Sequence, residues 1–510
     1  MSSTPRLSRR DLLKLAALAS AGLAARPLAS LLERQPQSDA PNVLIFVFDA
    51  WSARNMQLFG YPRQTMPNFE RIAARSTVYH NHYSTASFTV PGTASLLTSL
   101  YPWTHRAVQL SAGGVTHPHA DHNIFKVFEP THSNMGYAQN PYADTFLFQF
   151  QKSLDTHTSR DKFDLEVRNP ASLPLFQNDA RLAFAGFENN VLRSGKGEAG
   201  SLFLSTILRL VTLNRYGNLH REYLPAYPKG PPIAGGVFLL DELLNGTLQM
   251  LERIQPPTLG YFHLFPPHEP YAPTREFAGH FKDGWTPPEK PFHPLSRTRA
   301  PFSECVYNRL AYDQYLASWD AEVTRLLDFL ETSGLFDSSI IVFTSDHGEL
   351  FERGEIGHST LVLSDPVVRV PLFISVPGQT QRRDVYSYTS SVDLLPTLAH
   401  LASVGPVAWT EGQILPALGG PDDPNRSIYS LDAKMASSFS TFNQYSIALM
   451  RQGHRLIHYQ YPEYSGFEFY DMENDPEEMN DLSPSTPALM QDMKKELLQK
   501  VEDFNRPYRK

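Results

Sequence analysis

The sequence has a single cysteine, Cys305, among 510 residues, so no disulfide can form within the chain. It also lacks a basic excess: 45 Lys and Arg stand against 53 Asp and Glu, and the formal net charge is -8. Nucleic acids are bound through dense basic contacts, so this charge argues against nucleic acid as the main partner. No repeat of fixed period is present, which excludes a solenoid. The hydrophobic share of 41% is enough for a large packed interior.

No segment has the length and hydrophobicity needed to cross a bilayer, which takes about 20 apolar residues. The nearest candidate, Leu15–Ala25, is shorter and is interrupted at Arg26. It follows the pair Arg9 and Arg10, and paired arginines before a modest apolar run are typical of a twin-arginine export signal. We therefore expect residues 1–30 to be a signal peptide and the protein to be periplasmic or extracellular. An uncleaved anchor, which would leave the protein membrane-associated, stays an alternative.

Continuous apolar runs predict three buried strands, which are Asn42–Phe48, Thr258–Phe265 and Ser339–Phe343. Apolar residues at helical spacing mark Gly236–Ile254 and Tyr312–Leu330 between these strands. Buried strands that alternate with helices are typical of a parallel sheet with both faces covered. We therefore expect an α/β fold, with a mostly parallel sheet covered by helices on both faces, over residues 41–426.

Residues 427–510 have a different pattern. Tyr445–Leu449 and Arg455–Tyr459 alternate apolar and polar residues with period two on either side of a turn at Gly453, which predicts a hairpin. Met490–Phe504 predicts a closing helix. We expect a small C-terminal α+β subdomain here.

Two acids and a histidine follow predicted strands. Asp49 comes directly after the first strand, and Asp346 and His347 come shortly after the third. Functional groups of open α/β sheets gather where parallel strands end, so these side chains are expected to meet. With the hydroxyl of Thr89 they form a ligand set for one divalent metal ion. Carboxylate oxygens suit Ca²⁺ or Mg²⁺, and the imidazole also admits Mn²⁺ or Zn²⁺.

Thr89 lies just before a predicted helix, Gly92–Leu100. A helix N-terminus favours anions, and a metal ion lowers the proton affinity of a bound hydroxyl, so we expect Thr89 to be a nucleophile. His268 is expected to meet the anionic oxygens of an ester, and His358 to protonate the leaving group. Simpler roles stay open, with Thr89 as a helix cap and each histidine as a hydrogen-bonded loop residue.

Seven short motifs occur in one order along the chain. They are Asp49, Gly60–Asn68, Thr89–Pro102, Pro267–Tyr271, Ser345–Glu349, Arg369–Leu372 and Tyr470–Glu478. In this order they resemble the sulfatase family of the alkaline phosphatase superfamily. The resemblance covers about Asn42–Asn140 and Thr258–Leu482, whereas residues 147–232 match poorly and are expected to be a family-divergent insertion. It implies a sulfatase-like catalytic domain that uses a metal ion.

The departures from the family pattern bear on the substrate. Sulfatases carry a cysteine or serine that is oxidised to formylglycine, but this chain has Thr89, whose oxidation would give a ketone rather than an aldehyde. Thr93 stands in place of an arginine, and Ala50 in place of a second acid. A metal-bound threonine is instead similar to the phosphoethanolamine and glycerophosphate transferases and the nucleotide phosphodiesterases of the superfamily.

The resemblance therefore implies a hydrolase or transferase that acts on a phosphoric or sulfuric ester through a covalent Thr89 intermediate, with phosphodiester chemistry favoured. Alternatives are a sulfuric ester hydrolase that works without formylglycine, and a non-catalytic binding protein that kept the fold. The expected partner is a small anionic ester. A lipid head group is one option, because Leu202–Val211 could form an interfacial helix, although a core or lid helix is favoured for this segment. The oligomeric state stays open.

One further motif, His117–His122, reads His-x-His-x-Asp-His and matches the zinc motif of metallo-β-lactamase-type hydrolases. That fold places the motif directly after a strand and before glycines, whereas here Gly113 and Gly114 precede it. In the sulfatase register the motif falls in a loop. We expect a loop here and not a second metal site.

Overall fold

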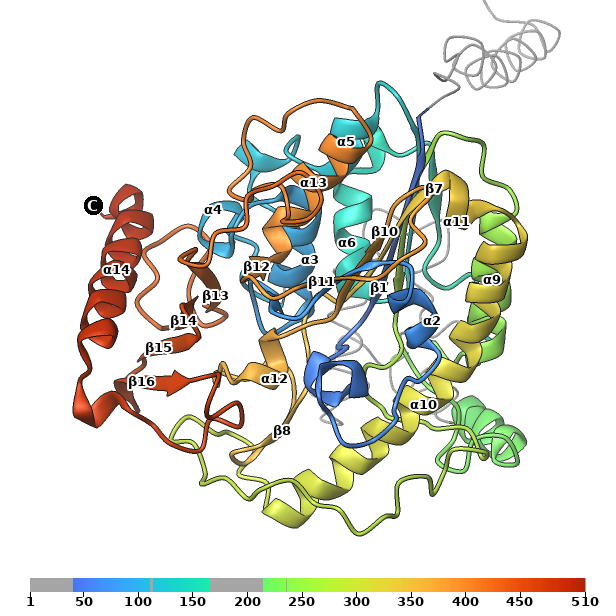
Figure 1. Cartoon of the computed structure of the whole chain (residues 1–510). Helices are drawn as coiled ribbons and strands as arrows, with labels where there is room; N and C mark the ends of the chain where they lie inside the picture. Colours follow the sequence, from blue (N-terminus) through green and yellow to red (C-terminus); the bar gives the residue numbers. More distant parts are fainter. Residues whose placement is uncertain (1–39, 111–112, 166–213, 235, 510) are drawn as a thin grey trace, which may run out of the picture.

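The computed structural model describes residues 40–110, 113–165, 214–234 and 236–509. At its centre is an eight-stranded sheet in the order β11-β2-β10-β7-β1-β6-β4-β5 (Figure 1). The strands are β1 (Asn42–Phe48), β2 (Thr77–Tyr79), β4 (Ser133–Ala138), β5 (Thr156–Thr158), β6 (Thr258–Leu264), β7 (Ser339–Thr344), β10 (Leu372–Ser375) and β11 (Arg383–Val385). The predicted signal peptide, the predicted helix at Leu202–Val211 and most of the predicted insertion lie outside the described residues.

The pairs of neighbouring strands in this sheet are parallel, except the two that β10 makes with β7 and β2. Strand β1 lies between β6 and β7, with Ile45 opposite Tyr261 on one side and Val342 on the other. Every residue of β1 and β7 is buried, which explains their continuous apolar sequences. The prediction of a mostly parallel sheet is confirmed.

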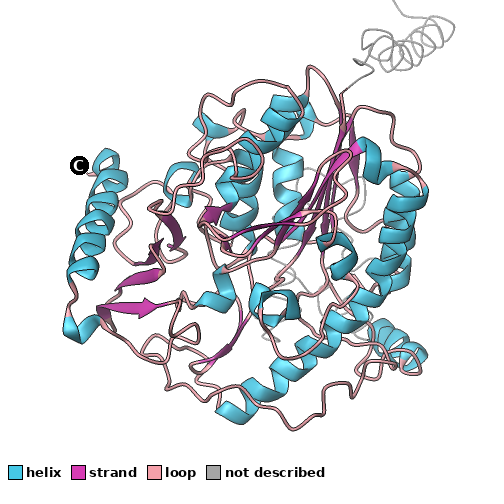
Figure 2. Ribbon diagram, viewed as in Figure 1, coloured by secondary structure: helices cyan, strands magenta, loops and turns pink. Residues whose placement is uncertain are grey.

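Alternate residues of β1 enter two separate hydrophobic clusters. Leu44, Phe46 and Phe48 pack with residues of α9 (Leu240–Leu251) and α10 (Phe302–Thr332). Val43, Ile45 and Val47 pack with residues of α3 (Thr89–Thr98), α5 (Ile124–Phe128), α6 (Pro141–Gln149) and α13 (Leu394–Leu401). The period of two along a strand puts these sets on opposite faces, so helices cover both faces of the sheet, as predicted (Figure 2).

The boundaries of α10 differ most from the sequence prediction, because the helix begins at Phe302 rather than Tyr312. Tyr307 is 60% exposed, whereas Tyr312 is fully buried. The first turns therefore extend past the core and carry no apolar stripe that the sequence pattern could show. The shorter elements are α2 (Phe69–Ala73), α4 (Pro102–His105), α11 (Leu335–Ser338), α12 (Asp365–Val368), and the strand pairs β3 (His82–Tyr83) with β12 (Thr389–Ser390) and β8 (Leu350–Glu352) with β9 (Glu355–Gly357).

The C-terminal residues form a second, antiparallel sheet followed by a helix. Its elements are β13 (Ile428–Asp432), β14 (Tyr445–Arg451), β15 (His454–Gln460), β16 (Ser465–Asp471) and α14 (Ala488–Asn505). Leu449 and Met493 belong to the cluster between this sheet and α14, while Ala448 and Ile457 pack with residues 350–368 of the main fold. The expected small C-terminal sheet unit is present, and it is packed onto the main sheet's loops.

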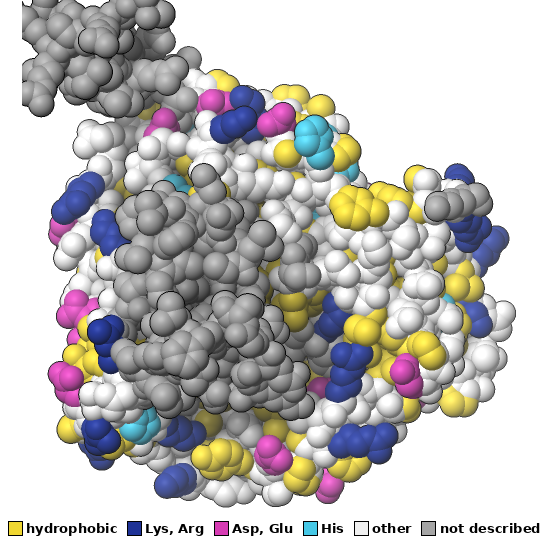
Figure 3. All heavy atoms as spheres, turned by 180° about the vertical axis from the view of Figure 1, so that it is seen from behind, with side chains coloured by type: hydrophobic (Ala, Val, Ile, Leu, Met, Phe, Trp, Pro, Cys, Tyr) yellow, Lys and Arg dark blue, Asp and Glu magenta, His cyan; other side chains and the backbone are white. Residues whose placement is uncertain are grey.

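Among the described residues, no helix has the length and apolar character of a membrane span. The face opposite to that of Figure 1 carries both basic and acidic side chains, scattered over its described surface (Figure 3). The exclusion of nucleic acid as a partner stays a prediction.

Candidate active site

Polar side chains gather at the carboxyl edge of the main sheet. Asp49 follows β1, Asp346 lies two residues after β7, and His263 is next to last in β6. Asn140 follows β4, and Thr89 is the first residue of α3. Strands β4, β6, β1 and β7 are parallel neighbours, so their carboxyl ends meet at one edge and bring these residues together.

Asp49, Asp346 and His347 form a group suited to a metal ion. One ligand atom from each lies within 4.8 Å of the others, and all three side chains are fully buried. His347 Nε2 is 3.4 Å from Asp49 Oδ1 and 3.6 Å from Asp346 Oδ2. Asp49 Oδ1 has no hydrogen-bond donor among the described residues. Two buried carboxylates this close to each other are stabilised by a cation between them, so these residues fit a divalent metal ion.

Thr89 directs its hydroxyl into this group. Its Oγ1 is 3.3 Å from His347 Nε2 and 3.3 Å from Asn140 Nδ2. The helix cap is Phe88, which makes no side-chain cap hydrogen bond, so Thr89 does not serve as the N-cap. The alternative role of Thr89 as a plain helix cap is therefore wrong. Its hydroxyl lies instead at the N-terminus of α3, where the helix dipole favours an anion.

The charges of the group are strongly coupled. Burial opposes charge on Asp49, but the nearby His268, His263 and His347 hold its pKa well below the usual value. Burial and the charge of Asp49 raise the pKa of Asp346. Against the effect of burial, Asp346 and Asp49 raise the pKa of His347 to about 9. Positive neighbours therefore favour the charged form of both acids, which is the electrostatic effect that a bound cation would also have.

His268 and His358 lie beside this group. The His358 ring centre is 4.4 Å from that of His347 and 4.4 Å from that of His268. Glu349 Oε1 is 3.0 Å from His358 Nδ1. Burial, with the charges of His347 and His268, lowers the pKa of His358 well below its usual value. The ring is therefore neutral near pH 7, and it must take up a proton before it can protonate a leaving group.

The sequence analysis assigned no role to three residues of this site. Asn140 Nδ2 is 2.5 Å from Asp49 Oδ2, and its Oδ1 accepts a hydrogen bond from Tyr142 N at the start of α6. His263 Nε2 is 3.3 Å from Asp49 Oδ2 and 3.7 Å from Asp346 Oδ2. Glu349 contacts His358 as described above. Asn140 had a usable signal, since it is a polar residue between a strand and a helix that begins with proline.

The histidines of His117–His122 do not join this group. His119 Nδ1 faces His122 Nδ1 at 3.2 Å, and Asp49, Asp346 and His347 form the only metal-type cluster found among the described residues. The expectation of no second metal site here stays a prediction.

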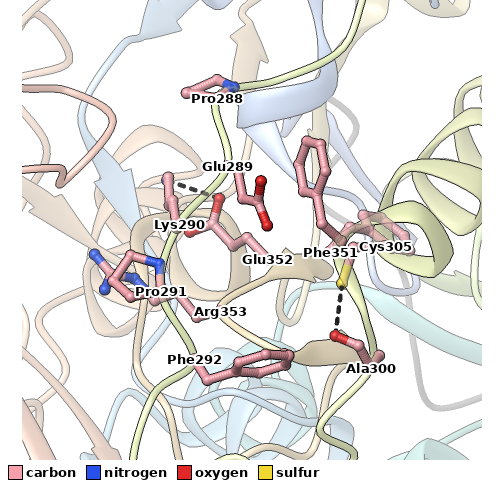
Figure 4. A pocket seen from close by; sticks show the side chains of 12 residues that line it. Pro288, Glu289, Lys290, Pro291, Phe292, Ala300, Cys305, Phe351, Glu352 and Arg353 are labelled. Atoms are coloured by element: carbon pink, nitrogen blue, oxygen red, sulfur yellow. Dashed lines mark hydrogen bonds and ion pairs between the residues drawn. The ribbon is translucent and has the colours of Figure 1, made fainter.

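Another feature is a pocket of about 220 Å³ beside the β8–β9 hairpin (Figure 4). It is lined by the Lys290–Glu352 ion pair and by the buried Cys305, and by none of the metal-site residues.

Comparison with known proteins agrees with this geometry. A family model described as "Sulfatase" matches residues 41–404, and one described as "N-sulphoglucosamine sulphohydrolase, C-terminal" matches residues 358–506. The fold and the buried ligand group define a metal-dependent ester hydrolase. Since the first match covers well over half of the chain, the chain belongs to the sulfatase family.

Several relatives are similar to this chain. An N-acetylglucosamine-6-O-sulfatase of Bacteroides thetaiotaomicron is 31% identical over 212 residues, which span 39% of this chain and 37% of that protein. The multifunctional alkaline phosphatase superfamily protein PehA of Trinickia caryophylli is 24% identical over 505 residues, covering 88% of this chain and 93% of PehA. Among solved structures, the phosphonate monoester hydrolase of Agrobacterium radiobacter has a TM-score of 0.65 at 17% identity, covering 91% of this chain and 96% of its own.

Proposed function

We propose that this protein hydrolyses or transfers a phosphoric or sulfuric ester through a covalent intermediate on Thr89, with phosphodiester-type chemistry favoured. The observation that carries the proposal is the position of the Thr89 hydroxyl. It lies 3.3 Å from His347 in the buried group that fits a metal ion, and it has no capping role that would explain it otherwise. A non-catalytic binding protein would have no need for a nucleophile at this position.

The residues divide the chemistry between them. Asp49, Asp346 and His347 would hold one divalent cation, which lowers the pKa of a hydroxyl beside it and neutralises the anionic ester oxygens. Asn140 fixes the Thr89 oxygen against Asp49. The Thr89 hydroxyl gives up its proton to water, and its oxygen forms a bond to phosphorus or sulfur as the bond to the leaving oxygen breaks. His358, which is neutral at rest, first takes up a proton from solvent and then passes it to the leaving oxygen. Water or an acceptor alcohol then releases the group from Thr89, while His268 meets its anionic oxygens.

The choice between phosphorus and sulfur rests on Thr89 itself. A threonine cannot become formylglycine, so the hydrated-aldehyde chemistry of sulfatases is closed to this chain. One relative, PehA, is described as multifunctional, and a structural neighbour is a phosphonate monoester hydrolase. These support a phosphorus ester as the first substrate class to test. Sulfate ester hydrolysis without formylglycine is the second, because the family match and the Bacteroides relative are to sulfatases.

We further propose that the protein is exported by the twin-arginine route to the periplasm or beyond. The paired arginines and the short apolar run near the N-terminus support this. The proposed substrate is a small anionic ester, including a lipid head group if the protein stays at the membrane. Ca²⁺, Mg²⁺, Mn²⁺ and Zn²⁺ are all compatible with two carboxylates and one imidazole.

The test is a substrate and metal screen with a matched pair of variants. Wild-type protein is loaded with each of the four metals and assayed on bis-nitrophenyl phosphate, nitrophenyl phosphate and nitrophenyl sulfate, with chelator as control. We expect turnover of a phosphate ester, loss of at least about 1000-fold in Thr89→Ala, and retention of a large part of the activity in Thr89→Ser, which keeps the hydroxyl. Undiminished activity in Thr89→Ala would refute the covalent mechanism.

A further inference from the structure

Strand β13 of the C-terminal sheet runs along the segment that leads to Thr89. Ser430 Oγ donates to Ser84 O at 2.6 Å, and Leu431 N donates to Thr85 O at 2.7 Å. Asp432 Oδ2 then accepts a hydrogen bond from Ser87 Oγ at 3.0 Å. Three successive residues of β13 thus form hydrogen bonds with the segment from Ser84 to Ser87, which leads to the proposed nucleophile Thr89.

Lys434, just after β13, extends this contact to a second active-site segment. Its Nζ is 2.9 Å from Asp432 Oδ2 and donates to Thr360 O at 3.0 Å. The same ammonium lies 5.0 Å from the centre of the Phe88 ring, within the range of a cation–π contact. The Lys434 side chain is 9% exposed and that of Asp432 is fully buried.

The two segments that this ion pair joins each end at a proposed functional group. Phe88 precedes Thr89, and Thr360 lies two residues after His358. They also touch directly, since Ser359 N donates to Ser87 O at 3.0 Å. The ion pair is therefore at the junction between the nucleophile segment and the histidine segment, although it comes from the C-terminal sheet.

A buried ion pair is a weak means of stabilising a fold. Its desolvation cost roughly cancels its attraction, and well-packed apolar residues of the same size are often as stable or more so. Such a pair does fix the relative position of the segments that it joins, because the hydrogen bonds of each charge are satisfied in only a few geometries. Here those geometries fix two segments whose separation sets the distance between Thr89 and His358.

We propose that Asp432 and Lys434 are positioning residues of the active site, and that the C-terminal sheet is a working part of the catalytic unit. They touch no substrate in this scheme. They act by holding Ser87–Thr89 and His358–Thr360 at a fixed separation, so that the nucleophile and the proton donor face the same ester. The proposal rests on the proposed function of Thr89, but it makes a separate structural prediction about the two segments.

The experiment compares three variants with the wild type. Lys434→Met leaves Asp432 buried without its cation. The double variant Asp432→Asn with Lys434→Met removes both charges and keeps an acceptor for Ser87. The control is Arg451→Met. It breaks the ion pair between Arg451 of the same sheet and Glu496 of α14, whose charged atoms are 2.6 Å apart. This pair touches neither active-site segment. Each is assayed for kcat and KM on bis-nitrophenyl phosphate, for bound metal, for Tm, and for amide exchange in residues 84–90 and 357–361.

A structural role and a positioning role give different results in the double variant. We expect its Tm to return to near the wild-type value and its metal content to be unchanged, because no unpaired charge remains. Its kcat should still be lower by roughly 100-fold at similar KM, as expected for a displacement of about 1 Å, with faster amide exchange in both segments. The control should keep wild-type kcat and exchange in these segments.

The proposal is wrong if the double variant has kcat within about threefold of the wild type, or if exchange in both segments is unchanged. That outcome, with Thr89→Ala inactive, would leave the proposed function intact. If instead the wild type turns over none of the esters, the proposed function fails. The exchange measurement then decides alone whether the ion pair holds the two segments.

Discussion

Replacing Gly92 by alanine tests the geometry of the site through one methyl group. Gly92 lies in the first turn of α3, and a Cβ at this position would stand 2.3 Å from Asp346 O and 3.0 Å from Asp346 C. Both are backbone atoms of a proposed metal ligand. The helix that carries Thr89 therefore approaches the backbone of Asp346 as closely as it does only because residue 92 has no side chain.

The size of the effect follows from these distances. Real Cβ contacts are essentially never shorter than 3.0 Å, so α3 or the Asp346 segment must move by about 0.7 Å. Because the clash is with backbone, no flexible side chain can absorb it. Such overpacking costs about 1–3 kcal/mol of folding free energy. A displacement near 1 Å between a nucleophile and its partners lowers the rate on the order of 100-fold, or about 2.7 kcal/mol in activation free energy.

The assay measures kcat/KM on the ester that the wild type turns over, together with Tm and bound metal. Gly217→Ala is the matched control, since a Cβ there meets nothing within 4 Å and the residue lies in a helix. It should keep full activity and gain up to about 1 kcal/mol in stability, because alanine favours helix. Wild-type activity and Tm in Gly92→Ala would show that the close approach of α3 to Asp346 does not set the site geometry.

Two further predictions concern stability. His105 is fully buried, and burial with the charge of His119 lowers its pKa to about 3. The unfolded chain takes up this proton below about pH 6.5 but the folded chain does not, so stability is kept above that pH and falls by about 2 kcal/mol near pH 5. Urea unfolding should show this loss of stability, and His105→Gln should remove it. An equal loss in the variant would contradict the attribution of this loss to His105. Arg455 is fully buried and pairs with Glu478 at 2.6 Å. Arg455→Met should cost about 3–5 kcal/mol in thermal or urea unfolding, and adding Glu478→Gln should recover much of it. A double variant no more stable than Arg455→Met would contradict this prediction.

The sequence allowed prediction of the parts of the site that obey a local rule. Asp49 and Asp346 follow strands whose buried, apolar sequences are hard to mistake, and parallel strands end at one edge. Their meeting was therefore predictable without knowing the strand order. The same holds for the hairpin of β14 and β15, which the period-two pattern and the turn at Gly453 predicted.

The parts that could not be predicted depend on neighbours distant in the chain. His263 faces Asp49 only because β6 pairs with β1, and a histidine inside an apolar strand has no local signal for this. Likewise, the role of Thr89 was ambiguous, since a threonine before a helix is also a common cap. The structure excludes the cap role because Phe88 is the cap residue of α3. The contact of Thr89 with Asn140, 51 residues away, could not be derived from either segment alone.

The burial of the ligand group also bears on how the protein reaches its destination. Asp49 and Asp346 are fully buried, and Asp49 Oδ1 has no donor within the described part of the chain. Metal binding to such a group is coupled to folding, because the unfolded chain presents no comparable site and a cation stabilises the buried carboxylates of the folded chain. A chain that is threaded unfolded across a membrane would have to find its metal on the far side. The twin-arginine route that we propose carries folded proteins, so the metal would be selected in the cytoplasm, and the metal content of the cytoplasmic precursor should already equal that of the exported protein.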